Sequence, residues 1–248
     1  MPRRQRLPRS FFGRSTLLVA RELLGQRLVR IDRGRRVSGW IIEAEAYIGQ
    51  ADLACHAHSG RTERNRVMWG DPGHAYVYFT YGMHWCLNVV TESAGQPAAV
   101  LLRALAPSQG VATMRRRRAL RSNSRHPSNG RPGTLSLAKG AGRSDGVRRA
   151  SSGSARLRPG FALARSKGLA DGPAKLCQAL AVDRRFNGHD LCAPKAQLFI
   201  ERAPAAPPRA VVRGPRIGLD NVPEPWKSKP WRFRLAPEVV PLLEEESA

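Results

Sequence analysis

Acidic residues are scarce in this 248-residue chain, and so is lysine. Lysines and arginines number 42 against 19 aspartates and glutamates, which leaves a formal net charge of +23. Only six of the basic residues are lysines, and none of the six precedes Lys139. A charge this positive predicts a polyanionic partner, with nucleic acid ahead of an acidic membrane surface. The length suffices for one or two domains with a sizeable core.

Paired cysteines and long apolar runs are also missing. The four cysteines are Cys55, Cys86, Cys177 and Cys192. None forms a Cys-x-x-Cys pair, which excludes a zinc ribbon and a dithiol redox motif, and we interpret them as reduced, mostly buried thiols of a reducing compartment. No apolar run approaches the roughly 20 residues that a membrane helix needs. The basic N-terminus leads into no apolar stretch of the kind found in a secretory signal, so we expect no membrane association.

Composition divides the chain into one domain with appendages. We expect a flexible basic arm over residues 1–9, an ordered domain over 10–235 and a frayed tail over 236–248. Inside the domain, residues 114–170 hold 15 lysines and arginines, a single acid (Asp145) and no periodic apolar pattern. Such a segment buries too little apolar surface to fold alone, so we predict a basic insert that is largely disordered.

The remaining patterns predict short helices and strands in mixed order. Ser15 can cap a helix that ends before Gly25, and Pro173 suits the first position of a helix through Leu180. Alternating or β-branched runs predict strands. These runs are Gln26–Asp32, Val37–Glu45, Tyr76–Thr80, Trp85–Val90, Ala98–Leu102, Leu198–Glu201 and Ala210–Val212.

The most distinctive stretch is aromatic and runs from residue 76 to residue 88. Gly82 lies between its two predicted strands and can adopt the positive φ of a tight hairpin. Strand alternation would place Tyr78 and Tyr81 on opposite faces. These aromatics suit the core of a β-sandwich. However, a hairpin tip lies at the surface, and Tyr81 with Met83 on a basic protein suits a wedge that enters a DNA groove.

Two carboxylates and a histidine pair precede the hairpin. Glu43 and Glu45 are two residues apart, so a strand would present both on one face. They are either ordinary surface glutamates or, at the end of a buried strand, a candidate base or metal ligand. His56 and His58 have the spacing of metal ligands beside a cysteine, but no second ligand cluster follows, and we predict no metal. Arg103, directly after a predicted buried strand, is placed to meet a carboxylate or a phosphate.

Several stretches together resemble the alkyladenine (3-methyladenine) DNA glycosylase family. The matching segments are residues 43–47, 64–66, 76–88, 101–105, 172–180, 216–218 and 230–233. They occur in order over roughly residues 10 to 235. The resemblance implies an α+β fold in one mixed domain, with a curved antiparallel sheet, flanking helices and a protruding hairpin that intercalates into DNA.

The resemblance also implies roles for individual residues. Glu45 would activate the attacking water with Arg103 as its partner. The flipped base would stack against Tyr47, His56 and Tyr78, and Asn88 would screen its edge against normal purines. Tyr81, with Met83 beside it, would fill the gap left in the helix.

These roles form a coherent chemistry. A carboxylate can deprotonate water and offset oxocarbenium charge at C1′. A lyase mechanism would need an amine, and no lysine lies between residue 1 and Arg103, so we expect a monofunctional hydrolase with no cofactor. The expected partner is double-stranded DNA containing damaged purines, bound by a monomer. We expect the protein to lie at the nucleoid in the cytoplasm of a bacterium, or in the nucleus of a eukaryote.

Two other functions remain open from the residues alone. One is a non-catalytic, basic nucleic-acid-binding protein, which has no use for a carboxylate in a basic groove. The other is a metal-dependent nuclease that uses Glu43, Glu45, His56 and His58. Release of free base from methylated duplex DNA in excess chelator would rule out both of these functions together.

Overall fold

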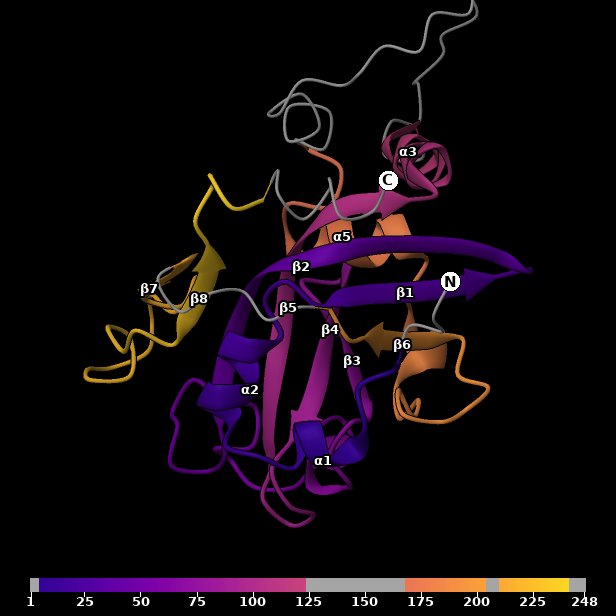
Figure 1. The fold of residues 1–248 in the computed structure, drawn as a ribbon. Helices are drawn as coiled ribbons and strands as arrows, with labels where there is room; N and C mark the ends of the chain where they lie inside the picture. The colour runs from indigo at the N-terminus through magenta and orange to yellow at the C-terminus, as the bar shows by residue number, and fades with distance from the viewer. Residues whose placement is uncertain (1–4, 124–167, 204–209, 241–248) are drawn as a thin grey trace, which may run out of the picture.

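A single curved antiparallel sheet organises the computed structural model, which describes residues 5–123, 168–203 and 210–240. Along its main path the strands are ordered β3-β4-β5-β2-β1-β6. Their bounds are β1 Arg27–Asp32, β2 Arg35–Ile48, β3 Ala75–Thr80, β4 His84–Thr91, β5 Ala98–Gln109 and β6 Leu198–Glu201. The expected α+β architecture in one domain is confirmed (Figure 1).

The long strand β2 holds the sheet together because it has neighbours along its whole length. β5 pairs with one edge over most of β2, from Ser38 to Ile48. On the other edge, β1 pairs with the first half, and β8 (Arg232–Leu235) pairs with Glu43–Glu45. β7 (Val211–Gly214) then pairs with β8. The C-terminal part of the chain is thereby brought beside the candidate carboxylates.

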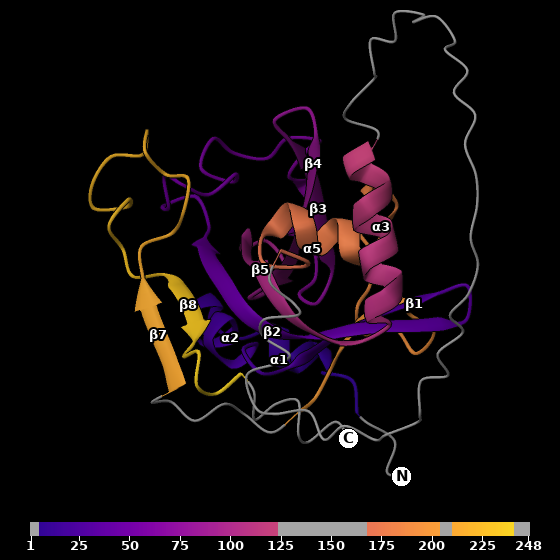
Figure 2. The same cartoon turned by 90° about the horizontal axis from the view of Figure 1, so that it is seen from above.

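Helices cover both faces of the sheet. α1 (Arg9–Phe12) and α2 (Thr16–Glu22) lie on one side, and α5 (Pro173–Leu180) and α3 (Val111–Asn123) lie on the other (Figure 2). Two short 3-10 turns, η1 (Arg66–Trp69) and η2 (Arg184–Phe186), complete the elements. The predicted apolar face of α5 is confirmed, since Leu176, Ala179 and Leu180 are all buried.

At three predicted boundaries, some of the described residues are packed into the fold. In the expected N-terminal arm, Leu7 is buried and its N–H donates to the carbonyl of Ile200. The expected insert begins with helix α3, and at its far end Leu169 and Ala170 are buried. In the expected tail, Val240 is buried. A few apolar side chains in basic or proline-rich sequence were enough to order these ends. Residues 1–4, 124–167 and 241–248 lie outside the described residues.

Strand β5 also differs from its prediction, and the difference concerns the site. It does not end before Arg103 but continues to Gln109. Ala44 faces Leu102 while Glu43 faces Ala104, so Arg103 is the extra residue of a β-bulge. Bulges redirect a side chain locally. Here the bulge turns Arg103 toward the carboxylates of β2.

Among the described residues, no helix combines the length and the apolarity needed to cross a membrane. The four cysteines are free thiols, three of them buried.

Candidate active site

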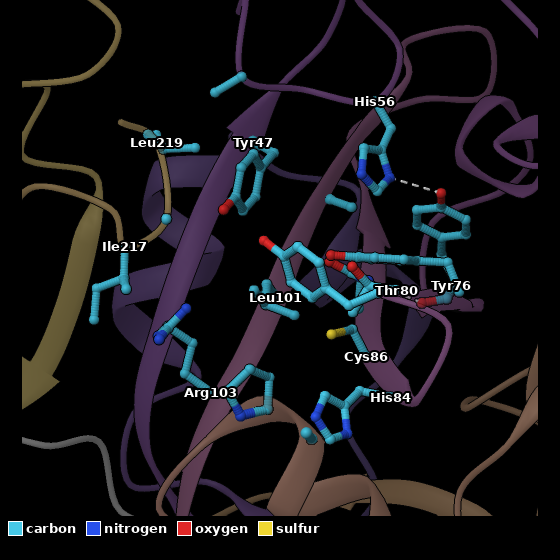
Figure 3. Close-up of a pocket in the computed structure, with 18 of the residues that line it drawn as sticks. Tyr47, His56, Tyr76, Thr80, His84, Cys86, Leu101, Arg103, Ile217 and Leu219 are labelled. Carbon is cyan, nitrogen blue, oxygen red and sulfur yellow. Dashed lines mark hydrogen bonds between the residues drawn. The ribbon is translucent and has the colours of Figure 1, made fainter. Parts of the chain in front are cut away.

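A cavity of about 360 Å³ opens on one face of the sheet. Strands β3, β4 and β5 each contribute alternate residues to it, as the two-residue period of a strand requires, and β2 contributes Tyr47. From the strands these are Tyr47, Tyr76, Tyr78, Thr80, His84, Cys86, Asn88, Ala99, Leu101 and Arg103. The rim is completed by the loop that carries His56, by the start of α5 and by Ile217–Leu219 (Figure 3). Its size is that of a site for a small ligand such as one base.

Glu45 lies behind the wall of this cavity and is fully buried. Its Oε1 accepts the backbone N–H of Ile217 at 2.8 Å. Its Oε2 accepts the Tyr47 hydroxyl at 2.9 Å and Nη1 of Arg103 at 3.2 Å. A carboxylate offers about four acceptor positions, so three donors leave room for one more. The arrangement can receive one proton from a fourth donor, such as a water molecule.

The protonation of Glu45 is set by opposing effects. Burial raises the pKa of the carboxyl above its ordinary value. The Arg103 cation and the hydrogen bonds from Ile217 and Tyr47 lower the pKa, and the nearby charge of Glu43 raises it again. A raised pKa makes the carboxylate a stronger base than a solvated glutamate, while its three donors favour the ionised form.

Arg103 joins the two carboxylates. Its Nε donates to Glu43 Oε1 at 3.0 Å, in addition to the bond from Nη1 to Glu45. Burial alone would lower the pKa of the guanidinium, but the charges of Glu45 and Glu43 raise it. Glu43 also accepts a bond of 3.4 Å from Arg232 of β8. Glu43 and Glu45 thus reach the same guanidinium, which agrees with the expectation that they share one face of the strand.

Aromatic rings form the opposite side of the cavity. His56 and Tyr78 meet edge to face with ring centres 4.5 Å apart, and His56 Nδ1 lies 2.9 Å from the Tyr76 hydroxyl (Figure 3). Desolvation beside these rings and the nearby Arg64 cation lower the pKa of His56 to about 4. Burial raises the pKa of the hydroxyl groups of Tyr47 and Tyr78. At neutral pH the walls therefore carry no charge.

The hairpin tip borders the cavity and is exposed. Strands β3 and β4 are joined by Tyr81, Gly82 and Met83. Tyr81 and Gly82 have positive φ (51° and 63°), and Met83 N–H donates to the Thr80 carbonyl at 3.2 Å. Tyr81 is 81% exposed and Met83 51%. The positive φ predicted for Gly82 is confirmed. The expectation that Tyr78 and Tyr81 face opposite ways is wrong, because Tyr81 belongs to the turn and both border the cavity.

Asn88 of β4 also lines the cavity. Its side chain is buried, and Nδ2 donates to the carbonyl of its cross-strand partner Tyr76 at 3.0 Å. That bond fixes the orientation of the amide. A group bound in the cavity therefore meets a hydrogen-bonding side chain that cannot turn freely to suit it.

The family model for methylpurine-DNA glycosylase matches residues 10–238. The chain belongs to the methylpurine-DNA glycosylase family. The resemblance drawn from its sequence motifs is thus confirmed, and the match spans the described sheet and every residue that lines the cavity.

Relatives named as glycosylases match over most of this chain. A protein of the archaeon Methanocella arvoryzae named a putative 3-methyladenine DNA glycosylase is 42% identical over 227 residues, which are 92% of this chain and 90% of that protein. A protein of Carboxydothermus hydrogenoformans with the same name is 39% identical over 229 residues, 92% of this chain and 94% of its own. The DNA-3-methyladenine glycosylase of mouse is 40% identical over 232 residues, 92% of this chain and 58% of the mouse protein.

Some features of this glycosylase-family site were not predicted. Ile217 contributes a backbone N–H, which no side-chain pattern reveals. Tyr76 holds His56 and Asn88, but its strand pattern suggested only an element of the hairpin. Arg216 and Ile217 lay in a stretch that resembled the family without an assigned role. A backbone donor supplied from 172 residues away leaves no local signal.

The residues considered for a metal site are separated. Nδ1 of His58 lies 3.1 Å from the carbonyl oxygen of Gln50, and His58 does not line the cavity. Within residues 5–123, 168–203 and 210–240, no three histidine, cysteine, aspartate or glutamate side chains are grouped so as to hold a metal ion.

Proposed function

We propose that this protein removes alkylated purines from damaged duplex DNA by hydrolysing the N-glycosidic bond, leaving an abasic site. One observation carries the proposal. A fully buried carboxylate, Glu45, keeps a single acceptor position open beside a cavity the size of one base. The names of the relatives, 3-methyladenine DNA glycosylases, support an alkylated purine as the substrate.

The base must leave the duplex before its glycosidic bond can be reached. Extrusion costs a few kcal/mol, and stacking on an aromatic ring returns about 1–3 kcal/mol per base. We propose Tyr47, His56 and Tyr78 as the stacking walls and Tyr81, with Met83, as the wedge that replaces the base in the helix. Because these aromatic side chains are neutral, they offer a cationic alkylpurine the π faces to which cations are attracted.

Hydrolysis then needs a water molecule and a stabilised cation at C1′. In the proposed step, Glu45 accepts a proton from a water molecule while the oxygen of that water bonds to C1′. The purine leaves with the electrons of the glycosidic bond. The carboxylate also offsets the oxocarbenium charge. Arg103 keeps Glu45 ionised and oriented. No lysine is among the residues that line the cavity, which supports water rather than an amine as the nucleophile.

Asn88 is placed to control selectivity, because it lines the cavity. We propose that Asn88, held by Tyr76, rejects normal purines whose edge groups clash with its fixed amide.

The protein would act as a monomer on double-stranded DNA, without a metal or cofactor and away from membranes. It would work at the nucleoid in a bacterial cytoplasm, or in the nucleus of a eukaryote.

The experiment is release of free purine from methylated duplex DNA in excess chelator, under single-turnover conditions. Parent protein should release base. Glu45→Gln should be slower by about 10²–10⁴-fold, the usual value of general-base catalysis, and should still bind the DNA because the amide keeps the shape. Glu43→Gln is the matched control, since it changes the other carboxylate on Arg103 and should lose far less.

Each rival predicts a different result. A metal-dependent nuclease would cut strands only without chelator, and a non-catalytic binding protein would release no base in either condition. Normal activity of Glu45→Gln together with an inactive Glu43→Gln would assign the role of base to Glu43 and overturn the assignment to Glu45.

A further inference from the structure

A second buried ion pair lies directly behind the site, between Asp52 and Arg216. Both side chains are fully buried. Nη1 and Nη2 of Arg216 donate to the two carboxylate oxygens of Asp52 at 2.5 and 2.8 Å, in the two-pronged geometry that favours arginine over lysine. Neither residue lines the cavity. The proposed reaction uses neither of them.

The pair ties together three segments that are distant in the sequence. Asp52 also accepts the backbone N–H groups of Ile48, at the end of β2, and of Ala54, in the loop that leads to His56. Arg216 also donates to the carbonyls of Ala46 and Trp226, at 3.0 and 3.2 Å. β2, the loop of the aromatic wall and the segment before β8 are therefore held by one pair of charges.

Two contacts carry this anchoring into the site. Ile217, which follows Arg216 directly, donates its N–H to Glu45. The guanidinium carbon of Arg216 lies 4.7 Å from the ring centre of Tyr47 and 5.0 Å from that of Trp231. Tyr47 in turn donates to Glu45. Two of the three donors to Glu45 thus depend on where Arg216 is held.

We propose that the Asp52–Arg216 pair is a positioning element of the active site, which holds the Ile217 N–H and the Tyr47 hydroxyl on Glu45 without touching the substrate. The inference rests on the proposed glycosylase function. A buried ion pair is weak evidence for stability, since well-packed apolar residues often serve as well. Its use here is geometric, because it fixes the donors that keep a buried carboxylate ionised and aimed.

The ionisation of Glu45 reports on this geometry. The groups that face Glu45 are Glu43 and Tyr47 on β2, Arg103 on β5, Cys86 on β4 and the Ile217 N–H. Arg232 of β8 approaches through Glu43. If the Ile217 bond loosens while the others stay, the charged carboxylate loses a donor and the pKa of Glu45 rises. The acid limb of the rate then moves to higher pH.

The test is Arg216→Lys, which keeps the charge but lacks the two-pronged contact. The single-turnover rate of base release at saturating protein should fall by about 10- to 100-fold, the usual penalty for a displacement near 1 Å. Binding to methylated duplex should change little. The acid limb should shift upward by roughly half a pH unit. Hydrogen exchange of the Ile217 amide should become faster, a readout that needs no catalysis.

The matched control is Arg36→Lys. Arg36 makes a similar two-pronged contact with Glu201, at 2.9 and 2.5 Å, remote from the cavity. That variant should lose some stability but keep the parent's rate and acid limb. A purely structural role for Arg216 would lower the folded fraction without moving the acid limb, because the position of the limb does not depend on how much protein is active.

The outcomes are distinct. An upward acid limb and faster Ile217 exchange in Arg216→Lys alone support the proposal. The parent's acid limb and exchange rate in that variant overturn it. If Arg216→Lys does not fold, Asp52→Glu tests the same pair by shifting its carboxylate by one methylene, with the same two outcomes. Absence of base release by the parent overturns the proposed function instead, and the exchange measurement still decides the positioning.

Discussion

The two ends of the cavity are built in opposite ways. At one end Glu45 is fully buried, with donors on both oxygens from β2, β5 and the segment before β8. At the other end Tyr81 is 81% exposed on the three-residue connection between β3 and β4. Proton abstraction gains from a dry, fixed environment, whereas a wedge must be free to enter DNA. The molecule therefore keeps its proposed chemistry inside and its proposed insertion outside.

The backbone repeats this contrast. The carboxylate end lies in a continuous sheet, where β2 and β5 stay paired on both sides of the register shifts near Glu43 and Arg103. The tip needs two consecutive residues with positive φ, for which Asn-Gly is the favoured sequence. Tyr81 takes the first of these positions at a cost of about 1 kcal/mol or more. The strain is explained if the ring is needed at the tip for its contact with DNA.

The largest expected effect in this comparison follows removal of the cation at the buried end. Arg103→Met should slow single-turnover base release by about 10²-fold. Because Arg103 lowers the pKa of Glu45, its loss should raise that pKa further and move the acid limb of the rate to higher pH. A pH–rate profile with methylated duplex measures both. An unshifted limb would mean that Glu45 is not the group that must be ionised.

A smaller effect is expected at the exposed end. Tyr81→Asn places the favoured Asn-Gly pair in the turn, so the thermal stability of the protein should stay the same or increase. Loss of the ring should nevertheless slow base release from duplex by roughly tenfold, the value of one stacking contact. Release from single strands should change much less. Equal losses on both substrates would show that Tyr81 acts within the cavity and not as a wedge.

The smallest effect is expected between the two ends. Asn88→Ala removes the fixed amide, and should relax the preference for damaged over normal purines by up to about tenfold. The rate with methylated duplex itself should change less than this ratio. Competition between methylated and unmethylated duplexes measures the preference. A ratio equal to the parent's would assign Asn88 to the fold of the hairpin through its bond to Tyr76.

Local chemistry explains which features were predictable. The hairpin, the strand carrying Glu43 and Glu45, and helix α5 follow from turn residues and apolar periodicity, and the structure contains each of them. Their boundaries moved where pairing extended a strand, as with β5 beyond Arg103. The sequence placed Arg103 where it could meet a carboxylate or a phosphate, but it predicted neither the contact with Glu43 nor the bulge, since both depend on how two strands pair.

Contacts between segments distant in the sequence could not be predicted from it. Leu7 lies in a basic segment, and it is buried in the main core beside strand β6, to which its N–H donates. The Ile217 amide and the Asp52–Arg216 pair depend on residues more than 160 positions apart. A sequence pattern records which groups are present, whereas these contacts depend on where the sheet brings them. The side chains proposed for catalysis were thus easier to foresee than the backbone that holds them.

The pairing of β8 with β2 has a consequence for folding during synthesis of the protein. Glu43–Glu45 are synthesised well before their partners, Ile217 and Arg232–Arg234. Domains fold during synthesis from the N-terminal side, so a nascent chain carries the proposed catalytic carboxylate before the strand and the amide that complete its surroundings. A chain terminated before residue 173 would carry strands β2 to β5 and the hairpin tip, yet lack the part of the cavity wall formed by α5 and Ile217–Leu219.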